Sequence, residues 1–152
     1  MSNSNSIVIL MADDDPEDVM LAEEALEEAR LLNDFYSVAD GEELMDYLHR
    51  REPYDDPKDS PTPGLILLDL NMPRKNGFEA LQEIKEDPEL RSIPVVVLTT
   101  SRAEEDVYRS YDLGVNSFIS KPVSFDGLVE AMKVLGQYWF KIVARPDGEH
   151  RE

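Results

Sequence analysis

The chain of 152 residues has no cysteine, no long apolar run and few basic residues. Without cysteine it forms neither disulfides nor thiolate zinc sites, and thiol catalysis is excluded. No apolar stretch approaches the ~20 residues that span a bilayer. The polar start MSNSNS also lacks the basic and apolar regions of a signal peptide. Together these absences favour a cytoplasmic protein.

The shortage of basic residues leaves a strongly acidic chain. Lys and Arg number 15 and Asp and Glu number 33, so the formal net charge is −18. Such a chain is repelled by nucleic acid and by anionic lipid surfaces, and we expect neither as a partner. We interpret most of these charges as a solvated surface. The length suits one domain with a sizeable core.

Five short apolar runs, rich in β-branched residues, alternate with segments of helical length. This alternation predicts an α/β fold in which helices cover a parallel sheet. The strands are expected at residues 7–11, 35–39, 65–68, 95–98 and 117–119. The helices are expected to begin near residues 16 and 40 and to span about 77–86, 103–113 and 125–143.

The predicted strands and helices form one folded unit over residues 7–144. Residues 1–6 are polar and are expected to be disordered, and residues 145–152 are expected to form a flexible tail. The interval 49–64 contains four prolines and exceeds the usual connection of ~4–6 residues. We interpret it as a surface loop inserted before the third strand, and we favour a passive insertion over a contact site for a partner.

Four predicted strands end in residues suited to metal or phosphate chemistry. Asp13 and Asp14 follow the first strand, Asp69 the third, Thr99 the fourth and Lys121 the fifth. Ligands bind beyond the carboxyl ends of parallel strands, so these side chains are expected to meet in one crevice. Three carboxylates suit Mg²⁺, and the Asp69 carboxylate is a candidate nucleophile toward phosphorus. The Thr99 hydroxyl and the Lys121 ammonium would then stabilise the anionic phosphoryl oxygens.

Over about residues 7–143 the chain closely resembles the receiver domain of two-component response regulators. Four motifs carry the resemblance, in the expected order and with matching spacing. They are Asp13-Asp14, Asp69-Leu-Asn-Met-Pro73 running to Gly77, Leu98-Thr99, and Ser120-Lys121-Pro122. The resemblance implies a flavodoxin-like (βα)5 fold, a doubly wound five-stranded parallel sheet with strand order 2-1-3-4-5.

The resemblance also implies a role for each residue of the crevice. Asp69 would be the phosphoacceptor, phosphorylated by a histidine kinase or a small phosphodonor. Asp14, Asp69 and the backbone carbonyl of Asn71 would ligate Mg²⁺, and Asp13 would assist through a water molecule. Lys121 would contact the phosphoryl oxygens.

The same family switches conformation when it is phosphorylated. The new group adds about −1.5 to −2 charge. By resemblance, Thr99 would move toward it and the aromatic ring of Phe118 would follow into the vacated space. The bond between Lys121 and Pro122 would be cis. Many relatives carry tyrosine where this chain has Phe118, so an output that needs that hydroxyl is not expected here.

The last predicted helix carries an aromatic cluster outside its core-facing stripe. Phe140 falls about a third of a turn from the stripe and Tyr138 lies near its opposite border. We regard both as candidate interface residues. Together with the proline-rich insertion, the Gln-Tyr-Trp-Phe sequence resembles the small regulators that accompany bacterial phytochrome kinases. That resemblance implies a homodimer.

The function expected is that of a stand-alone response regulator, since the chain ends soon after the last helix. It would act through a downstream protein target or a phosphotransfer protein, and it would not be an enzyme beyond its own phosphorylation and dephosphorylation. One alternative is a Mg²⁺-dependent aspartyl-phosphate phosphatase or phosphotransferase. Such haloacid-dehalogenase-like enzymes carry Asp-x-Asp-x-Thr, whereas this chain has Asn71 at the second Asp and no threonine. Another is an acidic Ca²⁺-binding or scaffold protein, although no EF-hand spacing is present.

Overall fold

A computed structural model describes most of the chain, in five segments. These are residues 7–31, 33–100, 104–115, 117–122 and 124–148. Both the segment 1–6, expected to be disordered, and residues 149–152 lie outside this part of the chain. No helix among the described residues is long and apolar enough to cross a membrane.

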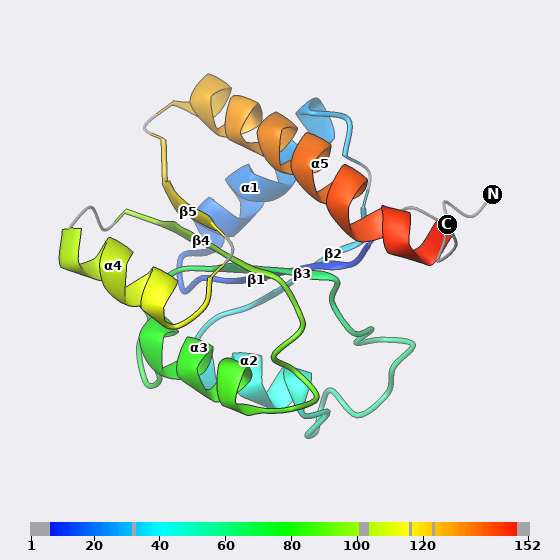
Figure 1. The fold of residues 1–152 in the computed structure, drawn as a ribbon, viewed down its shortest axis with the longest axis vertical. Coiled ribbons are helices and arrows are strands. Elements are labelled where there is room, and N and C mark those ends of the chain that lie inside the picture. Colours follow the sequence, from blue (N-terminus) through cyan, green and yellow to red (C-terminus); the bar gives the residue numbers. More distant parts are fainter. Residues whose placement is uncertain (1–6, 32, 101–103, 116, 123, 149–152) are drawn as a thin grey trace.

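Five parallel strands form one sheet in the order β2-β1-β3-β4-β5, which confirms the predicted fold (Figure 1). The strands are β1 (Ile9–Ala12), β2 (Phe35–Val38), β3 (Leu65–Leu68), β4 (Val95–Thr99) and β5 (Ser117–Ser120). Strands β1 and β3 are central and apolar throughout, as expected where helices cover both faces of a sheet. In their register Ala12 pairs with Leu68, so the residues that follow these two strands start side by side.

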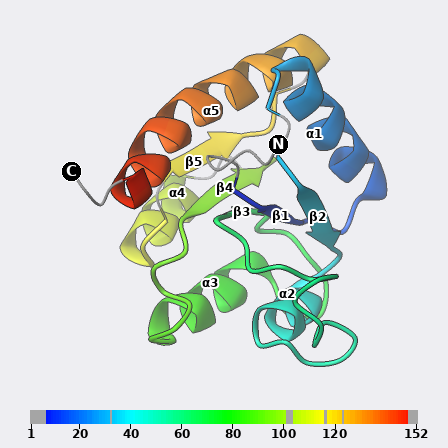
Figure 2. The ribbon, with the colours of Figure 1, turned by 90° about the vertical axis from the view of Figure 1, so that its right-hand side faces the viewer.

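Helices cover both faces of the sheet (Figures 1 and 2). They are α1 (Pro16–Glu28), α2 (Gly41–Leu48), α3 (Gly77–Glu86), α4 (Glu104–Asp112) and α5 (Phe125–Gly148). Helices α1 and α5 lie together on one face, and α2 and α3 lie on the other with α4 beside β5. Helix α5 ends at Gly148 instead of near residue 143, so part of the expected tail is helical. A proline removes one backbone hydrogen bond from a helix, which disfavours the helix without forbidding it.

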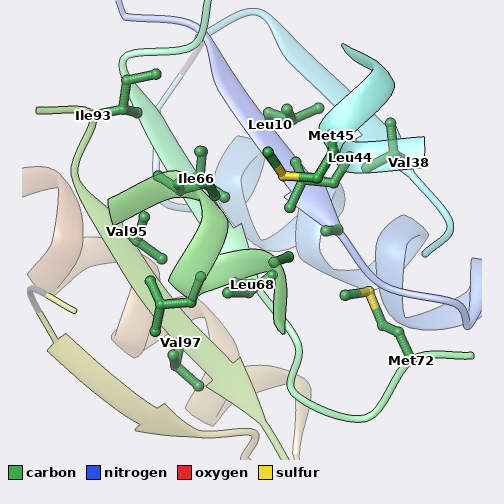
Figure 3. Packing of buried hydrophobic residues seen from close by; sticks show 14 of the residues in the cluster. Leu10, Val38, Leu44, Met45, Ile66, Leu68, Met72, Ile93, Val95 and Val97 are labelled. Carbon is green, nitrogen blue, oxygen red and sulfur yellow. The ribbon is translucent and has the colours of Figure 1, made fainter. Parts of the chain in front are cut away.

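The strand period of two divides the core into two clusters, one on each face of the sheet. Leu10 of β1 and Ile66 of β3 point toward α2 and α3 (Figure 3). Met11 and Leu67, the next residue on each strand, point toward α1 and α5. All four side chains are fully buried, and each contributes about 1.5–3 kcal/mol by leaving water. Apolar side chains cover both faces of the sheet, so the polar side chains gather beyond the carboxyl ends of the strands.

Short polar side chains set where the helices begin. Asp15 caps α1 and accepts a hydrogen bond from the Glu17 backbone N–H at 2.9 Å, and Pro16 takes the first helical position. Asn76 caps α3 and exchanges hydrogen bonds with Glu79 in a complete capping box. These caps fix the first turns of α1 and α3 directly after the loops that carry the polar residues of the sheet edge.

The insertion at 49–64 is a surface loop, as predicted, but it is held against α2. The guanidinium of Arg50 donates to the carbonyl of Ser60 at 2.9 Å and to the hydroxyl of Thr62 at 2.8 Å. The buried Tyr47 of α2 donates its hydroxyl to the carbonyl of Pro61 at 2.8 Å. These three bonds close the two ends of the insertion on each other, so the loop has a defined packing.

Candidate functional site

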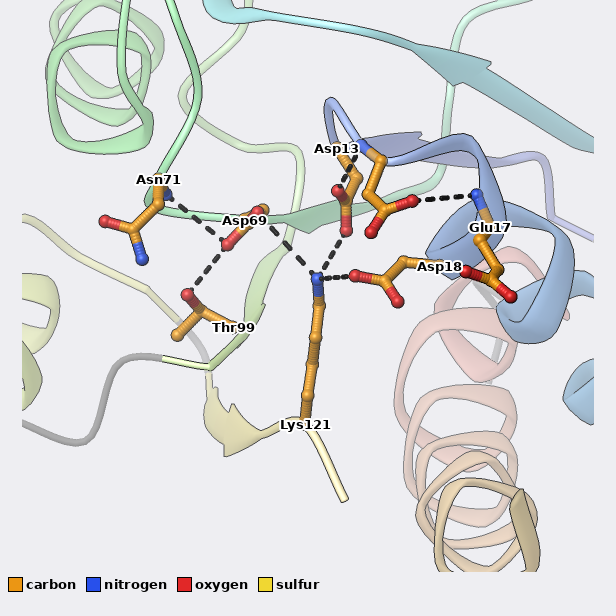
Figure 4. A network of polar contacts seen from close by, with 8 residues as sticks. Asp13, Glu17, Asp18, Asp69, Asn71, Thr99 and Lys121 are labelled. Carbon is orange, nitrogen blue, oxygen red and sulfur yellow. Dashed lines mark hydrogen bonds and ion pairs between the residues drawn. The ribbon is translucent and has the colours of Figure 1, made fainter. Parts of the chain in front are cut away.

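The carboxyl ends of four strands bring the predicted residues together at one edge of the sheet (Figure 4). Asp13 follows β1, Asp69 follows β3, Thr99 ends β4 and Lys121 follows β5. Backbone hydrogen bonds hold the strand ends side by side. The Asp69 N–H donates to the Ala12 carbonyl at 3.0 Å. The Lys121 N–H likewise donates to the Thr99 carbonyl at 2.7 Å. Parallel pairing thus places side chains from distant parts of the sequence around one point.

Three carboxylates at this edge can hold a cation. One oxygen from each of Asp13, Asp14 and Asp69 lies within 4.8 Å of the others. Asp13 and Asp69 are buried, with 3% and 5% exposure, while Asp14 faces solvent. An all-oxygen set with one open side suits a hard divalent cation that keeps some of its water. The residues present therefore fit the metal that the sequence predicts.

The Asp69 carboxylate is held in place through one oxygen. The Thr99 hydroxyl donates to Oδ1 at 2.7 Å, and the Asn71 backbone N–H approaches the same oxygen at 3.4 Å. The other oxygen, Oδ2, faces the Lys121 ammonium at 3.8 Å. Thr99 is fully buried, so its hydroxyl has little freedom to turn to solvent. Asp69 is thereby oriented with one oxygen fixed and one directed toward a positive charge.

Lys121 lies among carboxylates and is mostly buried. Its Nζ donates to Asp13 Oδ2 at 2.6 Å and to Asp18 Oδ2 at 2.8 Å. Burial acts to lower the pKa of Lys121, but the hydrogen bonds to Asp13 and Asp18 outweigh burial and raise that pKa above its ordinary value. The ammonium is therefore charged at neutral pH. Burial also raises the pKa of the Asp13 carboxyl, and the bond from Lys121 offsets this only in part.

Asp18 is the residue of this site that sequence reasoning missed. The sequence assigns it only to the N-terminus of a helix, and it does lie in the first turn of α1. The structure adds that its carboxylate binds Lys121. The available signal was helical spacing, because Asp18 precedes the buried Ala22 and Leu26 by one and two turns. That spacing places Asp18 on the face of α1 that meets α5 and the end of β5.

Three predicted features of the site remain: the ring of Phe118, the cis bond before Pro122, and the interface residues Tyr138 and Phe140. Phe118 on β5 is half-buried and packs against the cluster beneath α2 and α3. The cis bond expected before Pro122 is not found, since the cis peptide bond among the described residues joins Glu52 and Pro53. An X–Pro bond favours trans by about 0.5–1 kcal/mol, so trans is the default where the surroundings do not demand cis. The side chains of Tyr138 and Phe140 lie outside the described part of the structure.

Comparison with known proteins shows the family. Residues 9–133 match the response regulator receiver domain. The chain belongs to this family. Response regulator Rcp1 from a Synechocystis species is 40% identical to this receiver domain over 139 residues, which cover 91% of this chain and 92% of Rcp1. The family is one of signalling proteins, so the predicted class of function is confirmed.

Solved structures agree with this receiver domain in fold. A phosphorylated cyanobacterial phytochrome response regulator, RcpA, has a TM-score of 0.82 and 40% identity, covering 90% of this chain and 96% of its own. A Mn²⁺-bound form of Rcp1 has a TM-score of 0.79 and 39% identity, covering 89% and 95%. Receiver domains bind a divalent metal at an acidic pocket, and the cluster around Asp13 is such a pocket here.

Proposed function

We propose that Asp69 accepts a phosphoryl group from the phosphohistidine of a histidine kinase, and that the protein signals through the resulting change of shape. One observation carries the proposal. The Asp69 carboxylate is fixed through Oδ1 by Thr99 and turns Oδ2 toward the Lys121 ammonium, beside two further carboxylates. A nucleophile, a hydrogen-bond donor, a positive charge and oxygen ligands for a cation are what phosphoryl transfer to a carboxylate requires.

In the transfer step, an oxygen of the Asp69 carboxylate forms a bond to phosphorus and the bond from phosphorus to the histidine nitrogen breaks. The imidazole leaves with the electron pair of that bond and takes up a proton, and an acyl phosphate remains on Asp69. Asp14, Asp69 and the backbone carbonyl of Asn71 would hold Mg²⁺, with Asp13 acting through water. When bound, the cation offsets the negative charge of the phosphoryl group. The Lys121 ammonium would stabilise the same charge.

The change of shape begins with the hydrogen bond of Thr99. Its hydroxyl donates to Asp69 before phosphorylation and would donate to a phosphoryl oxygen afterwards, which draws the end of β4 toward the site. Phe118 pairs with Val97 of β4 in the sheet register and is half-buried, so it follows into the space released. The surface formed by α4, β5 and α5 then differs between the two states.

The relatives support a proposal for the partners. Because RcpA is a phytochrome response regulator, we infer that the kinase of this protein is a phytochrome. Output would pass to a downstream protein target or a phosphotransfer protein, and Tyr138 and Phe140 would contribute to a homodimer. A cytoplasmic location stays a prediction from the composition. Turnover of external phosphate esters is not part of the proposal, because Asn71 stands where haloacid-dehalogenase-like enzymes need a second Asp.

The experiment is phosphate transfer from a ³²P-labelled bacterial phytochrome kinase in the presence of Mg²⁺. We expect labelling that saturates at one phosphate per chain, and no labelling of the Asp69→Asn variant. An unchanged yield from that variant would show that another residue accepts phosphate. Continuous release of phosphate from a generic ester such as p-nitrophenyl phosphate would favour the enzyme alternative instead.

A further inference from the structure

The Lys121 ammonium lies between carboxylates on two sides of the site. Its Nζ hydrogen-bonds Asp13 at 2.6 Å and Asp18 at 2.8 Å, while Asp69 Oδ2 at 3.8 Å is beyond hydrogen-bond distance. Figure 4 shows Asp18 and Asp69 on opposite sides of the ammonium. Asp18 is also outside the group of carboxylates close enough to share a cation, which within the described residues is Asp13, Asp14 and Asp69. Asp18 therefore belongs to the surroundings of Lys121 and not to the candidate cation site.

We propose that Asp18 is a positioning residue that restrains Lys121 on the side away from Asp69 and so opposes phosphorylation. The inference rests on the proposed role of Asp69 as phosphoacceptor. A phosphoryl group on Asp69 brings about −1.5 to −2 charge to the far side of the ammonium. Lys121 is then drawn toward Asp69 and its bond with Asp18 lengthens. An interaction that is stronger before phosphorylation than after it lowers the equilibrium yield of the phosphorylated state.

The expected size follows from the exposure of the pair. The Asp18 side chain is 33% exposed and that of Lys121 is 13% exposed. The pair is thus more buried than a typical surface ion pair, for which coupling reaches about 1 kcal/mol. A loss of about 1 kcal/mol from the unphosphorylated state corresponds to a change of about fivefold in an equilibrium constant. We therefore expect Asp18→Asn to favour the phosphorylated state about fivefold.

The test uses beryllium trifluoride with Mg²⁺, a stable stand-in for the phosphoryl group, and measures its affinity by calorimetry and by fluorine NMR. Asp18→Asn is compared with wild type and with Glu17→Gln. Glu17 precedes Asp18 in the first turn of α1, is exposed, and is not among the residues that accept a hydrogen bond from Lys121. The control therefore removes one negative charge without touching the restraint. We expect about fivefold tighter binding for Asp18→Asn and little change for Glu17→Gln.

A second pair of variants separates the restraint from simple charge removal. In a Lys121→Met background, Asp18→Asn is expected to leave the affinity unchanged, because there is no ammonium to restrain. A gain of the same size in that background would overturn the inference, as would an affinity of Asp18→Asn equal to or weaker than that of Glu17→Gln. These results differ from failure of the proposed function, in which the wild-type protein itself binds no beryllium trifluoride and takes no label at Asp69.

Discussion

Replacing Gly77 with alanine tests whether the loop between Asp69 and α3 has room for a Cβ atom at this position. Gly77 is buried at the start of α3, and its N–H donates to the Leu70 carbonyl at 3.0 Å. A Cβ added at this position would lie 2.4 Å from the Asp69 carbonyl oxygen and 2.7 Å from the Leu70 Cα. Both neighbours are backbone atoms, so the loop that carries the acceptor has to move to relieve the contact.

The magnitude follows from two opposed effects. Helix propensity alone makes Gly→Ala neutral or stabilising, by up to ~1 kcal/mol. Overpacking against atoms that cannot turn away costs about 1–3 kcal/mol. We therefore expect Gly77→Ala to lower the free energy of unfolding by about 1–2 kcal/mol and to slow phosphorylation by acetyl phosphate, because the Asp69 backbone is displaced.

The assay is urea denaturation, with Gly127→Ala as the control. Gly127 lies in the first turn of α5, and its added Cβ would meet side-chain atoms of Pro122 and Ser124 at 3.0 Å and 3.1 Å, which are less close than the backbone contacts at Gly77. We expect a change below about 1 kcal/mol for the control. A Gly77→Ala variant as stable as wild type would refute the steric reasoning, and one that is destabilised but phosphorylated normally would remove the link between this loop and the site.

Three further predictions concern the insertion, the metal and Thr99. Arg50→Ala should lower the free energy of unfolding by about 1 kcal/mol and speed proteolysis within 49–64, whereas Arg51→Ala, which breaks an exposed ion pair, should do neither. In a thermal melt, Mg²⁺ should raise Tm more at about pH 7.5 than at about pH 5.5. Burial raises the pKa of Asp13, so protons compete with the cation for this carboxylate at the lower pH. An equal rise of Tm at both pH values would contradict this. Thr99→Val should reduce phosphorylation by acetyl phosphate much more than Thr99→Ser, which keeps the hydroxyl, and equal rates would exclude a role for that group.

The alternation of apolar runs and helical segments was sufficient to predict the fold class and the place of each strand. It succeeded because burial on both faces demands unbroken apolar strands such as Leu65–Leu68. The strand order came from the family resemblance, since an alternating pattern does not say which strands become neighbours. The gathering of Asp13, Asp69, Thr99 and Lys121 at one edge followed from the direction of parallel strands.

The features that the sequence did not reveal are tertiary contacts. A lysine ammonium has three hydrogen-bond donors and can bind any acidic residue that lies near it. The bond between Lys121 and Asp18 therefore depends on how α1 packs beside β5. The packing of the insertion depends likewise on Arg50. Its bonds to Ser60 and Thr62 join the two ends of the loop, and the sequence pattern predicts the loop without its internal contacts. The peptide bond before Pro122 depends on the turn around it, which local composition does not determine.

The most direct test of the account is to locate the phosphate. The protein is phosphorylated with acetyl phosphate and Mg²⁺, reduced with borohydride, which converts an aspartyl phosphate to homoserine, and analysed by tandem mass spectrometry. The account predicts homoserine at position 69 and unmodified Asp13 and Asp14. Homoserine at another aspartate, or no conversion in a protein that binds the cation, would contradict it.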